Sequence, residues 1–293
     1  MATPLREEGT LDGAGLERLI EHLILGGVHG LFILGTTGEG PALAREVQEE
    51  VIALTCRRVQ GRVPILVGIT NPCFADAVRL AGKANDCGAN AVVAAPPYYY
   101  SVSQDDLIHY AARLAGSVPL PLFLYNAPSN THHTLGVATV VRAAGIENIA
   151  GLKDSGADMI YFHVLREKLR SRPDFTLLVG PEELLAEALL LGADGGMCAG
   201  SNVYPQLFVS LYEAAKAGDM ERTAALHGKI MEFGSAIYRC AKHDANPLRG
   251  LKCALSEIGI CGDYVAPPLQ PYTAEERESV QRYVKSLEFA PVH

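Results

Sequence analysis

Lys153 is the residue whose setting in this sequence most directly indicates chemistry. It follows a short apolar segment at 149–152, which is typical of a buried strand, and it precedes a polar loop at 154–156. Lysine is seldom buried unless it is paired or used, and an amine taken out of water favours its neutral form, which attacks carbonyl carbon. The alternative is a snorkelling lysine, whose stem covers apolar surface while its amine stays in water. The groups near Lys153 decide between the two.

Tyr125 is the second candidate, because it ends the strand pattern at 121–125 that comes before the strand of Lys153. In a parallel barrel the carboxyl ends of the strands meet at one face, where such enzymes keep their sites. The phenol is therefore expected near the amine, where it would carry protons. The alternative is an amphipathic rim residue whose hydroxyl is satisfied elsewhere.

A glycine-rich turn at 35–40, with the sequence GTTGEG, is the third candidate. It lies between a strand pattern and a helix pattern, so it presents backbone N–H groups and the positive end of a helix to an anion such as a carboxylate. Thr36 and Thr37 add two hydroxyl groups. The turn has neither the lysine of a Walker P-loop nor the spacing of a dinucleotide-binding fingerprint. An ordinary tight turn is the alternative.

The elements that must position these residues form a repeating strand–helix pattern. Seven short segments, apolar on both faces, are each followed by a helical pattern, which indicates a parallel sheet covered by helices. The expected strands are 30–34, 65–68, 91–95, 121–125, 149–152, 175–179 and 195–199. A closed (β/α)8 barrel needs eight strands, so an open doubly wound sheet is the rival on pattern alone.

Beyond residue 218 the strand pattern stops. Helical patterns follow at 220–241, 247–258 and 274–287. We therefore divide the chain into a catalytic barrel at 1–217 and a C-terminal helical region at 218–293, which is suited to oligomer contacts.

Composition narrows the class of protein. The chain has 293 residues, 48% of them hydrophobic, and a net charge of −8. An acidic chain is not typical of proteins that bind nucleic acid or a membrane surface, and no apolar run approaches the ~20 residues of a membrane span. The start of the sequence lacks the pattern of a signal or transit peptide. Seven scattered cysteines without a C-x-x-C motif indicate reduced thiols, so we expect a cytoplasmic protein. The histidines show no metal-binding spacing.

Five motifs together resemble a known family. In order they are G-T-T-G-E at 35–39, P-Y-Y at 97–99, Y-N-x-P at 125–128, G-x-K-D at 151–154 and G-A-D-G-G at 192–196. The ordered set is similar to the superfamily of dihydrodipicolinate synthases and N-acetylneuraminate lyases, which are pyruvate-dependent class I aldolases. The resemblance covers nearly the whole chain. It implies an α/β fold, the (β/α)8 TIM barrel with C-terminal helices, and chemistry without a metal or an organic cofactor.

The resemblance also implies roles for the candidate residues. Lys153 would form a Schiff base with the keto carbon of pyruvate or another 2-oxo acid, and Tyr125 would move protons at that centre. Thr36 and Thr37 would bind the carboxylate, and Thr37 would also link to the tyrosines. The partners would be small molecules, a 2-oxo acid and an aldehyde.

Three more positions receive roles from the family. Tyr99 matches a tyrosine that reaches into the site of the neighbouring subunit, so the resemblance implies a homotetramer or a homodimer. Gly180 and Met197 match strand ends that line the pocket.

Asn130 departs from the pattern of dihydrodipicolinate synthases, which carry an arginine there to hold the carboxylate of the second substrate. An asparagine cannot make that bidentate charged pair. Asn130, the segment 153–158 and the segment 266–270 are more similar to 4-hydroxy-2-oxoglutarate aldolases and 2-keto-3-deoxy sugar acid aldolases. We therefore predict such an aldolase. The alternatives are a dihydrodipicolinate synthase or Schiff-base dehydratase on the same scaffold, and a non-catalytic protein that binds 2-oxo acids.

The start of the chain departs as well. In the family the first strand precedes a T-P motif, and here Thr3 and Pro4 already supply that motif. We therefore expect a stub or an irregular segment where the first barrel strand should run. A full-length strand ending near Thr3 would contradict this expectation.

Overall fold

A parallel sheet of seven strands forms the centre of the computed structural model, which describes residues 1–238 and 247–287. The strands are β1 Leu31–Ile33, β2 Ile65–Gly68, β3 Ala91–Ala94, β4 Leu122–Asn126, β5 Ile149–Asp154, β6 Thr176–Val179 and β7 Gly195–Gly196. Their order in the sheet is their order in the sequence, and all neighbours are parallel. A doubly wound sheet would reverse its order at a switch point. The sequential order therefore excludes that alternative and confirms the barrel.

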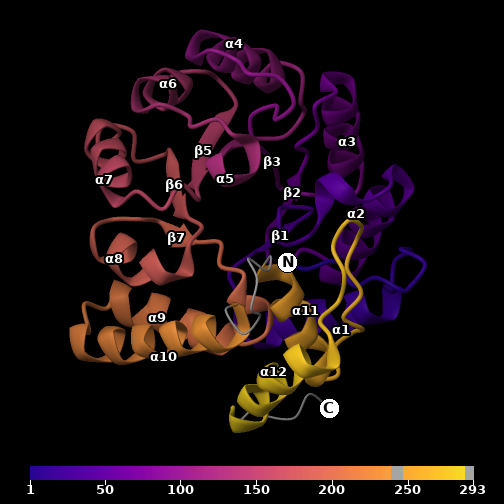
Figure 1. Cartoon of the computed structure of the whole chain (residues 1–293). Coiled ribbons are helices and arrows are strands. Elements are labelled where there is room, and N and C mark those ends of the chain that lie inside the picture. Colours follow the sequence, from indigo (N-terminus) through magenta and orange to yellow (C-terminus); the bar gives the residue numbers. More distant parts are fainter. Residues whose placement is uncertain (239–246, 288–293) are drawn as a thin grey trace.

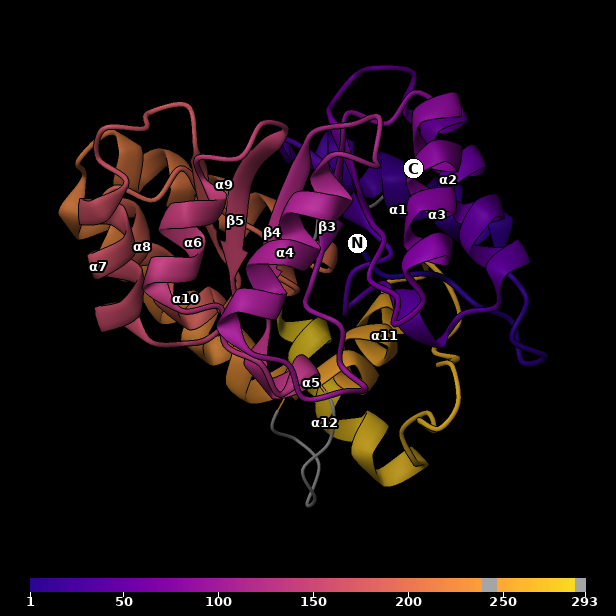
Figure 2. The ribbon, with the colours of Figure 1, turned by 90° about the horizontal axis from the view of Figure 1, so that it is seen from above.

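Helices lie around the outside of the curved sheet (Figure 1). Those of the barrel region are α1 Gly13–Leu25, α2 Arg45–Val59, α3 Phe74–Asp86, α4 Gln104–Ala115, α5 Pro128–Thr131, α6 Val137–Ala143, α7 Met159–Lys168, α8 Leu185–Leu190 and α9 Pro205–Lys216. Figure 2 shows α7, α8 and α9 on one side of the molecule and α1, α2 and α3 on the other. Among the helices of the described residues, none is long and apolar enough to cross a membrane. The helix α1 was not predicted.

The first residues form an irregular segment and no strand, as the sequence predicts. Residues 1–4 form no strand. The α-amino group of Met1 donates to the carbonyl of Phe32 in β1 at 2.5 Å, and the N–H of Ala2 donates to Asn202 Oδ1 at 2.8 Å. These contacts place the first residues between β1 and the turn that follows β7. The sheet is a TIM barrel that remains open at this point.

The prediction for the last strand, 195–199, is wrong in its length. The N–H of Met197 still donates to the carbonyl of Val179 on β6 at 2.8 Å. The chain then turns into a 3-10 helix at Gly200–Asn202, because the Gly200 N–H is held by the Glu182 carboxylate at 2.8 Å. β7 therefore spans only two residues.

Three C-terminal helices follow the barrel, as predicted. They are α10 Met220–Tyr238, α11 Pro247–Glu257 and α12 Ala274–Ser286. The predicted end of the first of them, at Ala241, and the thiol of Cys240 lie outside the described residues.

Candidate active site

Lys153 lies inside the barrel, on the penultimate residue of β5, and its side chain is only 6% exposed. The register of the sheet pairs it directly with Tyr125 on β4. Its Nζ lies 4.1 Å from the centre of the Tyr125 ring and 5.0 Å from the centre of the Phe32 ring. The amine therefore rests on two aromatic faces inside the barrel, and the snorkelling alternative is wrong.

The turn after Lys153 is held by the buried carboxylate of Asp154. This carboxylate accepts hydrogen bonds from Asn126 Nδ2 at 2.7 Å and from the Gly156 N–H at 3.1 Å. Burial raises the pKa of Asp154, and these hydrogen bonds oppose that rise. Asn126 is the last residue of β4. Its hydrogen bond to Asp154 therefore joins the ends of β4 and β5 one residue beyond the Tyr125–Lys153 pair.

The hydroxyl of Tyr125 is the centre of a small polar cluster. It lies 3.2 Å from Thr36 Oγ1 and 3.5 Å from Ser155 Oγ. Burial alone would raise the pKa of Tyr125, but the charge on Lys153 and the hydrogen bonds from Ser155, Thr36 and Lys153 lower it below its ordinary value. A phenol with a lowered pKa and a buried amine as neighbour can pass a proton in either direction. Ser155 was not singled out from the sequence, where it was only part of a loop.

The glycine-rich turn brings Thr36 and Thr37 to the cavity that contains Lys153. Thr36 meets Tyr125, whereas the resemblance had assigned the link to the tyrosines to Thr37. The turn is closed by hydrogen bonds from the Glu39 N–H to the Thr36 carbonyl at 3.1 Å and from the Gly40 N–H to the Gly35 carbonyl at 3.2 Å. A Cβ atom at position 40 would lie 2.0 Å from the Leu34 carbonyl oxygen, so only glycine allows this close return.

The cavity around Lys153 has a volume of about 370 Å³, which suits a small ligand. Thr36, Thr37 and Met197 line it at the carboxyl ends of the strands. It continues past the amine toward the amino ends, where His29 and Tyr212 line it beside the gap left by the missing strand. Across residues 1–238 and 247–287, no group of three or more His, Cys, Asp or Glu side chains is arranged to hold a metal ion.

Met1 also lines this cavity. Burial, and then the charge on Lys153, lower the pKa of its α-amino group to about 5. No pattern in the sequence predicts this contact, because it joins the first residue to β1, about 30 residues further along the chain.

Gly180 contacts the cluster from behind rather than lining the cavity. Its N–H donates to the carbonyl of Asp154 at 2.7 Å. A Cβ atom at this position would lie 1.9 Å from Ser155 Oγ. Gly180 therefore leaves room for the hydroxyl that lies beside Tyr125.

Two predicted residues lie away from the cavity within one chain. Asn130 is exposed on α5, where its Oδ1 accepts a hydrogen bond from Ser129 Oγ at 3.4 Å. Tyr99 is 76% exposed and packs edge-on against Tyr100, with ring centres 5.0 Å apart. Lys153, Tyr125, Thr36, Thr37 and Met197 are thus brought together, and Asn130 and Tyr99 are not.

Comparison with known proteins places this geometry in a family. The Dihydrodipicolinate synthetase family matches residues 1–287. The chain belongs to this family. It is therefore an enzyme of the lyase class, a pyruvate-dependent class I aldolase of the dihydrodipicolinate synthetase family.

Relatives of the dihydrodipicolinate synthetase family include proteins named as aldolases and proteins named as synthases. The chain is 33% identical over 300 residues to the probable 2-dehydro-3-deoxy-D-pentonate aldolase of Escherichia coli, covering 100% of this chain and 97% of that one. It is 32% identical over 279 residues to the 4-hydroxy-tetrahydrodipicolinate synthase of Methanopyrus kandleri, covering 94% and 90%. Among solved structures, dihydrodipicolinate synthase from Bacteroides thetaiotaomicron is similar, with a TM-score of 0.95, 47% identity, and coverage of 98% and 96%.

Proposed function

We propose that this protein is a Schiff-base aldolase that uses Lys153 to join pyruvate to an aldehyde, or to cleave the joined product into these two compounds. Its substrate class would be a 2-oxo acid such as 4-hydroxy-2-oxoglutarate or a 2-keto-3-deoxy sugar acid. The observation that carries the proposal is the buried Lys153 amine directly beside Tyr125, whose hydroxyl meets Thr36.

The chemistry follows from these groups. The neutral amine of Lys153 attacks C2 of the 2-oxo acid, and loss of water gives a protonated imine. In the cleavage direction a base removes the proton of the C4 hydroxyl, the C3–C4 bond breaks, and its electron pair moves into the imine to form an enamine. The aldehyde leaves, and protonation and hydrolysis of the enamine release pyruvate. Tyr125 would carry protons at C2, while the Thr36–Thr37 turn would hold the carboxylate and orient C2 toward the amine.

Asn130 supports the choice of an aldolase over a synthase. In the motif resemblance it matches the position at which the synthases carry an arginine, and it would offer a neutral amide in place of a bidentate cation. The similarity to the E. coli protein with the name of a pentonate aldolase supports the same choice.

A second candidate function is the condensation of pyruvate with aspartate semialdehyde, the dihydrodipicolinate synthase reaction. The 47% identity to the Bacteroides thetaiotaomicron protein of that name favours it. Both candidates share the imine on Lys153 and differ only in the second carbonyl compound.

A substrate panel tests the proposal. The purified protein is given 4-hydroxy-2-oxoglutarate, 2-keto-3-deoxy sugar acids, and pyruvate with aspartate semialdehyde, and the release or consumption of pyruvate is followed. We expect release from at least one of the first two classes and none from the Lys153→Ala variant. Turnover confined to the aspartate semialdehyde mixture would contradict the aldolase and establish the second candidate. Turnover by Lys153→Ala would contradict both.

We further propose that the enzyme works as a cytoplasmic homotetramer or homodimer. The exposed Tyr99 supports this assembly, because an aromatic ring with 76% exposure gains from burial against another subunit. The barrel at 1–217 would carry the catalysis, and the C-terminal helical region at 218–293 would pack beside it.

A further inference from the structure

Glu39 is the residue of the glycine-rich turn that has no part in the chemistry described above. It lies two residues after Thr37 and adopts the left-handed backbone conformation, with φ of 56°. Such a conformation is uncommon for residues other than glycine, asparagine and aspartate, and it persists only where the surroundings hold it. The Glu39 side chain is 3% exposed and contacts the C-terminal helical region rather than the cavity.

Two groups of the C-terminal region hold this carboxylate. The N–H of Ala266 donates to Glu39 Oε2 at 2.6 Å, across 227 residues of sequence. The amine of Lys252, on α11, forms an ion pair with the same carboxylate. Lys252 is completely buried, and its Nζ also donates to the carbonyl of Tyr264 at 2.6 Å. Burial lowers the pKa of Lys252, and Glu39 opposes that change.

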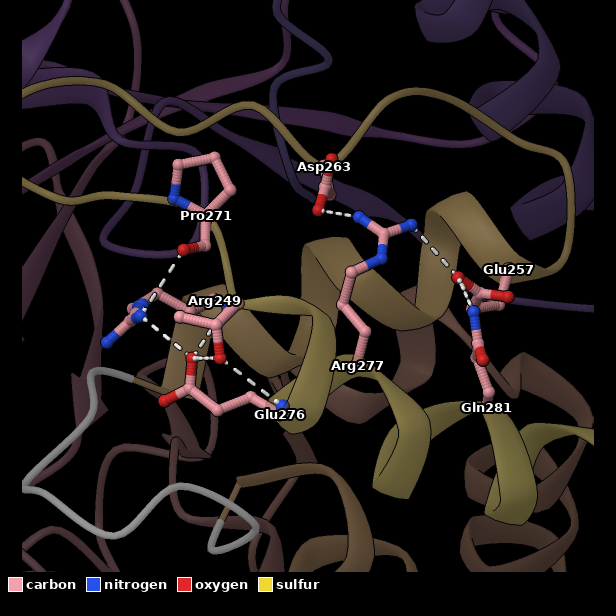
Figure 3. Close-up of polar contacts among 8 residues, drawn as sticks. Arg249, Glu257, Asp263, Pro271, Glu276, Arg277 and Gln281 are labelled. Carbon is pink, nitrogen blue, oxygen red and sulfur yellow. Dashed lines mark hydrogen bonds and ion pairs between the residues drawn. The ribbon is translucent and has the colours of Figure 1, made fainter.

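The segment that supplies Tyr264 and Ala266 is itself fixed in place. Figure 3 shows Arg277 of α12 between Asp263, at the start of this segment, and Glu257, at the end of α11. At the other end of the segment Arg249 of α11 donates to the carbonyl of Pro271 at 3.3 Å. The contacts of Glu39 are therefore made to a rigid support.

We infer that Glu39 and Lys252 are positioning residues, through which the C-terminal helices hold the Thr36–Thr37 turn in the geometry that binds the carboxylate of the 2-oxo acid. The inference rests on the proposed function of that turn. The connection from Glu39 to the site is short, because the Glu39 N–H donates to the Thr36 carbonyl and Thr36 Oγ1 contacts the Tyr125 hydroxyl.

Stability alone does not explain this pair. Taking two charges out of water costs about as much as their attraction returns, so a buried ion pair is seldom a net source of stability. Its geometry is specific, however, because each carboxylate oxygen of Glu39 contacts a different group. Oε1 pairs with the Lys252 amine, and Oε2 accepts from the Ala266 N–H. An ion pair of this kind fixes the position of the turn and adds little to the free energy of unfolding.

The test uses the full chain and the double variant Glu39→Gln with Lys252→Met. Each single change would leave an unpaired buried charge and so a poorly folded protein, whereas the double variant removes both charges together. Borohydride trapping of pyruvate is measured over a range of pyruvate concentrations. We expect the half-saturating concentration to rise about 10-fold to 100-fold, because misplacement of a binding loop costs on this scale.

The half-saturating concentration separates positioning from folding. A purely structural role would reduce the amount of trapped protein at saturation without changing the concentration at half-saturation. An unchanged half-saturating concentration in the double variant therefore overturns the inference. Glu21→Gln is the control. It removes two ion pairs of Glu21 on α1, with Arg58 of α2 at 2.7 Å and with Arg62, which follows α2, at 2.8 Å. It should leave the half-saturating concentration unchanged. If the wild-type protein itself traps no pyruvate, the proposed function fails and the inference falls with it. This result differs from a wild-type protein that traps pyruvate and a double variant with an unchanged half-saturating concentration, which overturns the inference alone.

Discussion

Among the single residues of the site, Tyr125 is the one that we propose as the proton carrier. Its hydroxyl lies within hydrogen-bond distance of Thr36 and Ser155, and the amine of Lys153 lies over the face of its ring. We expect Tyr125→Phe to lower the rate of pyruvate release by about 10²-fold to 10⁴-fold, the range found for a positioned acid–base group. The ring remains, so the fold should persist. Steady-state kinetics with the preferred substrate and circular dichroism check this, and a variant within threefold of wild type would exclude Tyr125 as the proton carrier.

Gly180 gives a second prediction at this scale, concerning stability. In Gly180→Ala the new methyl group would meet Ser155 Oγ at 1.9 Å and Ser155 Cβ at 3.0 Å. We expect a loss of about 1–3 kcal/mol in the free energy of unfolding, which is typical of overpacking. Urea denaturation measures it.

Two variants control this experiment. Adding Ser155→Gly removes the two nearest atoms that the methyl group meets and leaves the Asp154 carbonyl oxygen at 3.2 Å, so part of the loss should be recovered. Gly82→Ala adds a methyl group that meets nothing within 4 Å in helix α3, and it should stabilise the protein by up to about 1 kcal/mol. Equal effects of Gly180→Ala and Gly82→Ala would show that Ser155 does not constrain position 180.

At the scale of elements, Glu182 links the turn after β6 to the turn after β7. Its carboxylate accepts from the Gly200 N–H, and burial raises its pKa to about 7 against the opposing effect of this hydrogen bond. The folded state therefore holds this proton more tightly than the unfolded state. This group contributes its full stability below pH 4.5, the ordinary value, and the contribution is lost as pH rises to about 7.

Glu182→Gln should remove this titration while keeping an acceptor for Gly200. Relative to wild type, the variant should gain about 3 kcal/mol in its free energy of unfolding between pH 4.5 and pH 7, from the size of the pKa change. Urea denaturation of both proteins at several pH values gives the difference, in which all other titrating groups cancel. A flat difference for Glu182→Gln would contradict the assignment.

The sequence predicted most elements because each buries apolar residues at a regular spacing. α9 begins and ends where predicted, and β2 does too. The helix α1 was missed although Leu16, Leu19, Ile20 and Leu23 follow helical spacing and the Asp12 side chain caps it. The length of β7 could not be predicted, because the chain that follows the strand is drawn into a turn in which Glu182 accepts from the Gly200 N–H, a contact with the turn after β6.

For the molecule as a whole, the sequence could predict those parts of the site that the carboxyl ends of the strands position. Lys153 and Tyr125 meet because parallel strands place their carboxyl ends side by side, and the register confirms this. The Phe32 ring beneath Lys153 and the support of Glu39 by Lys252 depend on the closure of the barrel and on the C-terminal helices. Such contacts leave no spacing pattern in the sequence.

The open side between β1 and β7 belongs to this scale as well. Met1 occupies one end of it, and the cavity of Lys153 extends along it toward His29 and Tyr212. The Lys153 amine has its aromatic neighbours in place, because Tyr125 lies on β4 and Phe32 on β1.

Borohydride trapping with pyruvate is the decisive measurement for the imine that we propose on Lys153. The protein is incubated with pyruvate, reduced, digested and examined by mass spectrometry, with Lys153→Ala treated in the same way. We expect the mass of one reduced pyruvate on the peptide that contains Lys153, and no addition to the variant. An unmodified protein, or a modification at another lysine, would show that Lys153 does not form this imine.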